Sequence, residues 1–157
     1  MDDPMRKEDA EQRLVDSWCR CFARGMMNDA GLPDPDTVIR SCHVAHFREL
    51  DLENTLKAYV GKVGEFPSFL EEEWKWKVHY DRATNVITAD ENKDHCVCPL
   101  ARRGVIESGK LCLCSEGFAQ SLFSYVLQKE VTVKILRSWL RDGKSCVYEV
   151  SCAGPAT

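Results

Sequence analysis

Two closely spaced pairs of cysteines are the residues of this chain best suited to chemistry. One residue separates Cys96 from Cys98 and Cys112 from Cys114, and thirteen residues lie between the pairs. Side chains at positions i and i+2 of an extended segment point to one side of the backbone, so each pair can direct two sulfur atoms toward one point. Four thiolates suit zinc or an iron–sulfur cluster. The spacing therefore predicts a metal site at Cys96, Cys98, Cys112 and Cys114.

The nine cysteines of the chain also admit a simpler interpretation. Free cysteine is among the most buried residue types, so these side chains can pack without a metal. A high, odd number of cysteines in a reducing compartment indicates metal binding, catalysis or burial rather than a disulfide framework. Cys146 and Cys152 fit a packed sheet face. Zinc is slightly favoured over an iron–sulfur cluster because the pairs lie in short loops without a Cys-x-x-Cys run. The possibility that the chain binds no metal stays open.

Cys42 and His46 form a second constellation. On a helix they lie one turn apart on one face, so His46 can act as the base for a Cys42 nucleophile. The alternative is that Cys42 is a core residue, with Val38 and Ile39 one turn away. The apolar spacing favours that alternative.

Three aromatic residues, Trp74, Trp76 and Tyr80, alternate with polar residues and share one face of an expected strand. They can line a pocket for a flat ligand. Alternating aromatic residues more often form the core face of a sheet, however, and this is the favoured interpretation.

Composition excludes several classes of function. The 157 residues, 44% of them hydrophobic, predict one domain over 1–152 with a real core and a frayed tail at 153–157. A net charge of −4 argues against nucleic acid and anionic membranes as partners. No apolar run has membrane-spanning length and the start lacks an apolar signal core, so we expect a cytoplasmic location.

The first half of the chain has a helical pattern. Apolar residues at three-to-four spacing predict a helix over 8–28, and the Gly/Pro-rich segment 31–36 ends it. Asp36 is expected to cap a second helix that extends to Phe47. A third helix over 52–60 is expected to begin at Asp51 and stop at Gly61, with one further turn at 67–70.

The second half is dominated by alternating apolar and polar residues. These predict strands over 74–81 and 86–89, and again over 131–135 and 146–152. A helix capped by Ser115 is expected between the two strand pairs, and Asp142-Gly143 predicts the second hairpin turn. The order predicts an α+β fold, with N-terminal helices packed on an antiparallel sheet of two hairpins and a cysteine-rich loop.

The C-terminal part resembles a known family. The runs Cys112–Phe118, Glu130–Val133 and Ser138–Tyr148 are similar to the end of vinyl-reductase-type small-molecule-binding domains. In those domains a G-D-x-x-C-x-F-like hairpin ends the sheet, and Asp142-Gly-Lys-Ser-Cys-Val-Tyr148 stands at its place. The L-2-amino-thiazoline-4-carboxylate hydrolase group and uncharacterised anaerobe proteins with paired cysteines look similar over the same stretch, residues 94–152.

This resemblance implies a fold like that of the heme-nitric-oxide-binding group, with a ligand pocket between helices and sheet. It also implies sensing of aromatic or other small hydrophobic ligands. Some phenol-sensing members bind zinc through a Glu and cysteines near the final hairpin. Cys146 matches the last of those cysteines, but Ile135 and Ser138 stand where the Glu and the first cysteine would be. The family's zinc site is therefore not expected in this chain.

Three hypotheses for function follow. The first is a cytoplasmic sensor or carrier that binds a small hydrophobic or aromatic ligand and has a cysteine-ligated metal. The second is a small hydrolase of the amino-thiazoline type that uses Cys42 with His46, or a metal-bound water. The third is a non-catalytic scaffold with buried cysteines. A homodimer is one hypothesis for the assembly of the chain, and the oligomeric state stays open.

Overall fold

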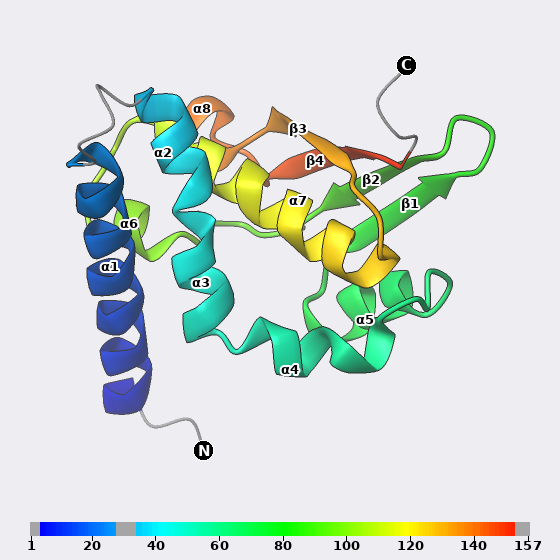
Figure 1. Ribbon diagram of the computed structural model, residues 1–157, viewed down its shortest axis with the longest axis horizontal. Coiled ribbons are helices and arrows are strands. Elements are labelled where there is room, and N and C mark those ends of the chain that lie inside the picture. The colour runs from blue at the N-terminus through cyan, green and yellow to red at the C-terminus, as the bar shows by residue number, and fades with distance from the viewer. Residues whose placement is uncertain (1–3, 28–33, 153–157) are drawn as a thin grey trace.

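A four-stranded antiparallel sheet with helices on one face organises the chain, as Figure 1 shows for the computed structural model, which describes residues 4–27 and 34–152. The strand order is β1-β2-β4-β3, so two hairpins lie side by side with β2 against β4. This confirms the α+β class. The elements in chain order are α1 (Pro4–Met26), α2 (Pro35–Ser41), α3 (His43–Glu49), α4 (Leu52–Leu56), a 3₁₀ turn (Lys57–Tyr59), α5 (Phe66–Glu73), β1 (Lys77–Asp81), β2 (Val86–Asp90), α6 (Pro99–Arg102), a 3₁₀ turn (Gly109–Leu111), α7 (Cys112–Leu127), β3 (Thr132–Arg137), α8 (Trp139–Asp142) and β4 (Val147–Ser151).

One face of the sheet is buried and supplies much of the core. Ile87 lies opposite Val150, and Ala89 lies opposite Tyr148, in the register of β2 and β4. All four side chains are buried, whereas Glu149 between them on β4 is exposed. This alternation is the pattern of an antiparallel sheet that has one face toward solvent.

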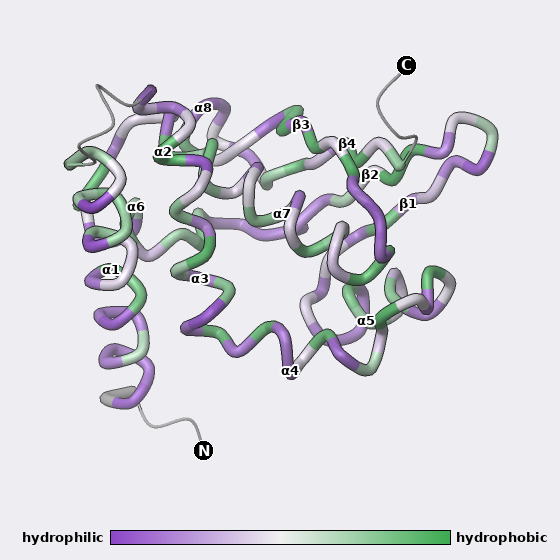
Figure 2. Tube along the Cα trace, viewed as in Figure 1, coloured by the Kyte–Doolittle hydropathy of each residue, from purple (hydrophilic) through white to green (hydrophobic). Residues whose placement is uncertain are grey.

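The helices form successive layers on the buried face. α7 packs against β3 and β4, α2 and α3 pack on α7, and α1 packs on α2 and α3 (Figure 1). Hydrophobic residues recur between hydrophilic ones along α1, as expected for a helix that buries only one side (Figure 2). Among the described residues, no helix is long and apolar enough to cross a membrane.

Two polar contacts attach α1 to the helices beneath it. The indole Nε1–H of Trp18 donates a hydrogen bond to the Sγ of Cys114 on α7, at 3.3 Å. The guanidinium of Arg48 on α3 donates to the hydroxyl of Ser17, at 2.5 Å. Trp18 and Ser17 are both buried, so these bonds fix the position of α1 on the core.

The helix predicted from Asp36 to Phe47 is divided. α2 ends at Ser41 and α3 begins at His43, with Cys42 between them donating its N–H to the carbonyls of α2. The cap is Asp34 rather than Asp36, since the Asp34 carboxylate accepts from the N–H groups of Asp36 and Thr37 at 3.3 and 3.2 Å. Pro35 explains the earlier start, because proline is favoured in the first turn of a helix, where its missing N–H is not needed.

The third predicted helix is observed as α4 followed directly by a 3₁₀ turn. Asp51 stands at the N-cap position, but its carboxylate accepts from the side chain of Asn54 at 2.9 Å rather than from the helix backbone. Gly61 has a φ of +77°, the left-handed conformation that favours glycine after a helix.

Two predicted features of the second half are wrong. Ser115 is not a cap, because α7 already begins at Cys112, after a 3₁₀ turn capped by Ser108. Asp142 and Gly143 do not form a hairpin turn but end α8, with Gly143 at a φ of +62°. Ser138 caps α8 by accepting from the N–H of Arg141, so local capping gives a short helix between β3 and β4.

A β-bulge interrupts the edge strand β3 between Ile135 and Arg137. At this point the N–H of Ile135 donates to the carboxylate of Glu116 on α7, at 3.2 Å. The same carboxylate also pairs with Arg40 of α2, at 3.1 Å. One side chain therefore joins the sheet edge to two helices. The predicted tail, 153–157, lies outside the described residues.

Candidate functional site

A cavity of about 360 Å³ lies where α1, α3, α6, α7 and β4 meet the segment that follows β2. We call it the inner cavity. It lies between the helices and the sheet, so its walls come from segments far apart in the sequence. The polar residues that line it include His46, Glu91, Ser115 and Tyr148. The apolar walls are formed by Ala10, Leu14, Leu50, Val97, Pro99 and Phe118.

Glu91 is the most unusual residue of the inner cavity because it is an acid with only 7% of its surface exposed. Its Oε1 accepts a hydrogen bond from the hydroxyl of Tyr148 at 2.7 Å. Its Oε2 is buried and has no hydrogen-bond partner. Burial raises the pKa of Glu91, although the bond from Tyr148 acts in the opposite direction. Burial also raises the pKa of Tyr148, which keeps its hydroxyl a donor.

His46 contributes a second buried polar atom without a partner. Its Nε2 is inaccessible to solvent and makes no hydrogen bond. Burial, together with the nearby His43, lowers the pKa of His46 to about 4. The ring is therefore uncharged at neutral pH. The inner cavity thus combines an uncharged imidazole and a buried carboxyl group with apolar walls.

An ion pair lies in the wall of the inner cavity. Arg102 of α6 pairs with Glu11 of α1, and both residues line the cavity. Arg103 and Glu8 form a longer pair, at 4.0 Å, between the same two helices. Both pairs are partly exposed, so we expect each to contribute little to stability.

The sulfur atoms of Cys112 and Cys114 do not point toward a common position. The two residues belong to the first turn of α7, where positions i and i+2 point to different sides. The Cys112 thiol donates to the hydroxyl of Ser138 at 3.2 Å, near the sheet, whereas Cys114 accepts from Trp18 beneath α1. The premise of an extended second pair is therefore wrong, and the four predicted ligands do not converge.

Another set of four thiols lines a single small cavity. Cys96, Cys98, Cys112 and Cys146 surround a space of about 20 Å³, together with Glu91. Burial raises the pKa of Cys98 to about 11 and that of Cys146 to about 12, so both thiols are protonated at neutral pH. Within residues 4–27 and 34–152, no three His, Cys, Asp or Glu side chains are close enough to hold a metal ion. A zinc ion or an iron–sulfur cluster bound by cysteines therefore stays a prediction.

Cys42 and His46 lie in different environments. Cys42 is fully buried and packs with Val38, Ala45 and Cys114. Burial raises the pKa of the Cys42 thiol far above its ordinary value, and the nearby Cys21 thiol adds to this effect. A nucleophilic cysteine needs an accessible thiol with a lowered pKa. This environment opposes the hypothesis of a Cys42–His46 nucleophile and base.

The three aromatic residues proposed as a binding face are not equivalent. Trp76 is buried and stacks on Tyr148 with ring centres 5.9 Å apart. Trp74 is half-buried beside it, at 5.5 Å. Tyr80 is exposed, and its hydroxyl donates to the side chain of Asn85. Trp76 is thus a core residue, as the alternative interpretation expected, and a ligand role for the three side chains stays a prediction.

Glu91 and Tyr148 were not predicted as site residues, but the sequence contains a signal for both. Ile87, Ala89 and Glu91 are two residues apart and continue the buried side of β2, and Ala89 lies opposite Tyr148. An acid that continues the apolar positions of a strand indicates a buried carboxyl group, which needs a partner or a ligand. Tyr148 occupies the corresponding position on β4.

The comparisons with known proteins leave these residues without an assigned role. The resemblance to small-molecule-binding domains therefore stays a prediction, and the inner cavity is interpreted from its own geometry. No protein-family model, curated protein or solved structure matches this chain.

Proposed function

We propose that this chain is a small-molecule-binding module, a sensor or carrier whose ligand occupies the inner cavity. The observation that carries the proposal is the pair of buried polar atoms without partners, Nε2 of His46 and Oε2 of Glu91. Both residues line the same, mostly apolar cavity. A cavity with apolar walls and a few polar groups with altered pKa values has the composition of a ligand site.

The two unpartnered atoms favour the binding of a ligand in the inner cavity. A buried polar group without a hydrogen bond costs about 1–3 kcal/mol of stability. If the two side chains turn these atoms toward the cavity, a ligand there can supply the missing hydrogen bonds and recover part of this cost, in addition to the apolar surface that it buries. His46 and Glu91 would then select for hydrogen-bonding groups on an otherwise apolar molecule.

Charge and size narrow the class of ligand. His46 is uncharged at neutral pH, and Glu91 is held in a setting that disfavours its ionised form. The cations that line the cavity are Lys7, which is exposed, and Arg102, which already pairs with Glu11, so neither offers a carboxylate ligand a buried, unpaired partner. The volume of about 360 Å³ lies near the lower end of the range of roughly 300–1,000 Å³ for ligand pockets. We therefore propose a small, neutral, hydrophobic or aromatic ligand with a hydroxyl or amide group.

Binding of matched aromatic compounds tests the proposal. Benzyl alcohol and benzamide are neutral and carry hydrogen-bonding groups, toluene carries none, and benzoate is charged. We expect the first two to raise the melting temperature more than toluene and benzoate do, since ligands that bind only the folded state stabilise it. Titration calorimetry then gives the affinities.

Two variants assign the binding to the inner cavity. His46→Leu and Glu91→Leu each remove one unpartnered polar atom, and the loss of one hydrogen bond, about 1.4 kcal/mol, weakens binding of benzyl alcohol about tenfold. His79→Leu is the matched control, because His79 is exposed on β1. Equal affinities in all three variants, or stronger binding of toluene than of benzyl alcohol, would refute the proposal.

A further inference from the structure

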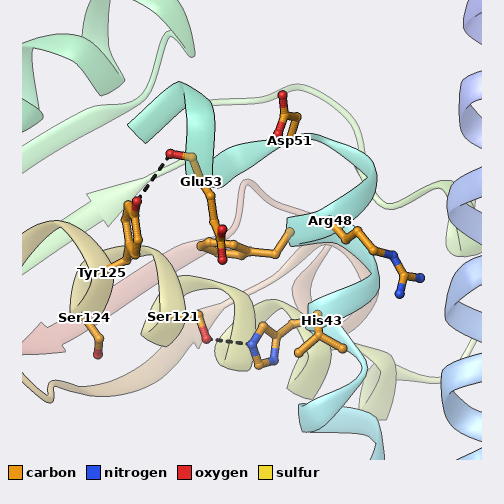
Figure 3. A pocket seen from close by; sticks show the side chains of 9 residues that line it. His43, Arg48, Asp51, Glu53, Ser121, Ser124 and Tyr125 are labelled. Carbon is orange, nitrogen blue, oxygen red and sulfur yellow. Dashed lines mark hydrogen bonds between the residues drawn. The ribbon is translucent and has the colours of Figure 1, made fainter. Parts of the chain in front are cut away.

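A second and larger cavity lies on the opposite side of α3 from α1. It has a volume of about 670 Å³ and is formed by α3, the start of α4 and the second half of α7 (Figure 3). We call it the outer cavity, and define it by His43, Phe47, Asp51, Glu53, Ser121 and Tyr125. Since the inner cavity has a different set of lining residues, the two cavities are distinct sites.

Ser121 and His43 face one another at the wall of the outer cavity, as the dashed line in Figure 3 marks. The Oγ of Ser121 is 2.6 Å from Nε2 of His43. The other ring nitrogen, Nδ1, is 2.8 Å from the backbone carbonyl oxygen of Arg40. A carbonyl oxygen can only accept, so Nδ1 must carry the proton and donate it. Nε2 is then the acceptor for the hydroxyl of Ser121.

Gly117 makes room for this arrangement. It lies on α7 one turn before Ser121, so the two residues share one side of the helix. A Cβ atom at Gly117 would lie 2.3 Å from the carbonyl oxygen of Arg40 and 2.9 Å from Nδ1 of His43. The imidazole therefore lies over the glycine and reaches the serine one turn further along. The glycine, the oriented imidazole and the hydroxyl form one fitted unit.

We propose that Ser121 is a nucleophile activated by His43 and that the outer cavity is an esterase site. An imidazole that accepts from a serine hydroxyl, with its other nitrogen oriented by a third group, is the arrangement of a serine nucleophile and its base. Here the orienting group is the Arg40 carbonyl rather than a carboxylate. This activity goes beyond the binding function of the inner cavity.

The proposed reaction needs only an ester and water. The Oγ of Ser121 bonds to the ester carbonyl carbon while its proton moves to Nε2 of His43. The carbon–oxygen bond to the alcohol breaks, and the alcohol leaves with the proton from Nε2. Water then bonds to the acyl carbon and gives a proton to Nε2. Oγ leaves the acyl group and regains that proton, so that ester and water become acid and alcohol.

The walls of the outer cavity define the class of ester. Phe47 and Tyr125 offer aromatic surface, and Asp51 and Glu53 bring carboxylates. Arg48 is engaged elsewhere, by the hydroxyl of Ser17 and the carboxylate of Glu49, and in Figure 3 its side chain points toward α1. Excess negative charge disfavours an anionic substrate. We therefore expect uncharged carboxylic esters with a small apolar acyl group.

A fluorophosphonate probe, which bonds to activated serines, tests the proposal directly. We expect mass spectrometry of the folded protein to locate the probe on Ser121, and we expect hydrolysis of p-nitrophenyl butyrate to be lost in Ser121→Ala. His43→Ala should slow labelling at least about 100-fold, because a general base contributes roughly 10²–10⁴. His43→Asn should do the same, since asparagine can donate to the Arg40 carbonyl but cannot take the proton.

Ser68→Ala is the matched control. Ser68 is an exposed serine on α5 and lines neither cavity. We expect this variant to keep the wild-type rate of labelling at Ser121. Circular dichroism and melting curves show which variants are folded. An unlabelled Ser121 in the folded wild-type protein, or an equal loss of labelling in Ser68→Ala, would overturn the proposal.

Discussion

Replacing Gly117 by alanine tests the close packing of α7 against α2 and α3. In an ordinary helix interior this change stabilises by about 1 kcal/mol, because alanine has the higher helix propensity. Here the new methyl group would lie 2.3 Å from the carbonyl oxygen of Arg40. This oxygen belongs to the backbone and accepts from His43, so it cannot rotate away.

The clash should outweigh the gain in propensity. Overpacking costs about 1–3 kcal/mol, and contact with a backbone atom places this site toward the upper end of that range. After subtraction of the propensity gain, we expect a net loss of about 1–2 kcal/mol. For a chain of this size the melting temperature should fall by about 2–8 °C.

Urea denaturation and thermal melting measure the change. Gly64→Ala is the matched control, because a Cβ atom there meets nothing within 4 Å. We expect that control to be neutral or slightly stabilising, since alanine restricts the unfolded chain. A Gly117→Ala variant as stable as the control would show that α2 and α7 are not held as closely as described.

Four further predictions concern the inner cavity and the thiols. Burial lowers the pKa of His46 from 6.5 to about 4, so the unfolded chain binds this proton at a higher pH than the folded chain does. The free energy of unfolding should therefore fall as the pH falls through this window. Urea denaturation at several pH values should show a smaller fall for His46→Leu. Burial raises the pKa of Glu91, so its contribution to stability is lost as the pH rises; Glu91→Gln should be more stable than wild type near neutral pH, with the advantage gone below about pH 4. Cys42 should resist iodoacetamide until the protein unfolds, as followed by mass spectrometry, because its thiol is fully buried. Any zinc found by elemental analysis after anaerobic purification should be lost in Cys112→Ser and kept in Cys114→Ser, because Cys112 lines the cavity of four thiols and Cys114 does not. Loss of zinc in both variants would favour the site predicted from the paired spacing.

Local patterns predicted most of the elements. The alternation of apolar and polar residues in the two strand pairs predicted which residues form the buried face of the sheet. Tyr148 and Val150, for example, are two residues apart and both buried. Boundaries that depend on one capping residue were less certain, because several polar residues compete for the position. Asp34 caps α2 in place of the predicted Asp36. Ser108 caps a 3₁₀ turn that leads into α7, which therefore begins earlier than predicted, and Ser138 caps a short helix where a hairpin turn was predicted.

The sites were harder to predict, because they depend on contacts between distant segments. His43 and Ser121 are 78 residues apart, and Glu91 and Tyr148 are 57 apart. No local period encodes such a pair. The paired cysteines were misleading for the opposite reason: their spacing is local, but its meaning depends on whether the segment is extended, and Cys112 and Cys114 lie on a helix. The glycine within α7 was the available signal of a close approach.

The bond between Glu116 and the bulge in β3 has a consequence for how copies of the chain can associate. An edge strand normally presents free N–H groups on which a strand from another chain can align. At the bulge, the N–H of Ile135 is already taken by Glu116, and the register between Ile135 and Arg137 is broken. Another strand could not continue the sheet past β3 without losing that bond and matching an irregular edge. Growth of the sheet into open-ended stacks is therefore opposed on this side, so a paired assembly that extends the sheet would have to use β1 instead.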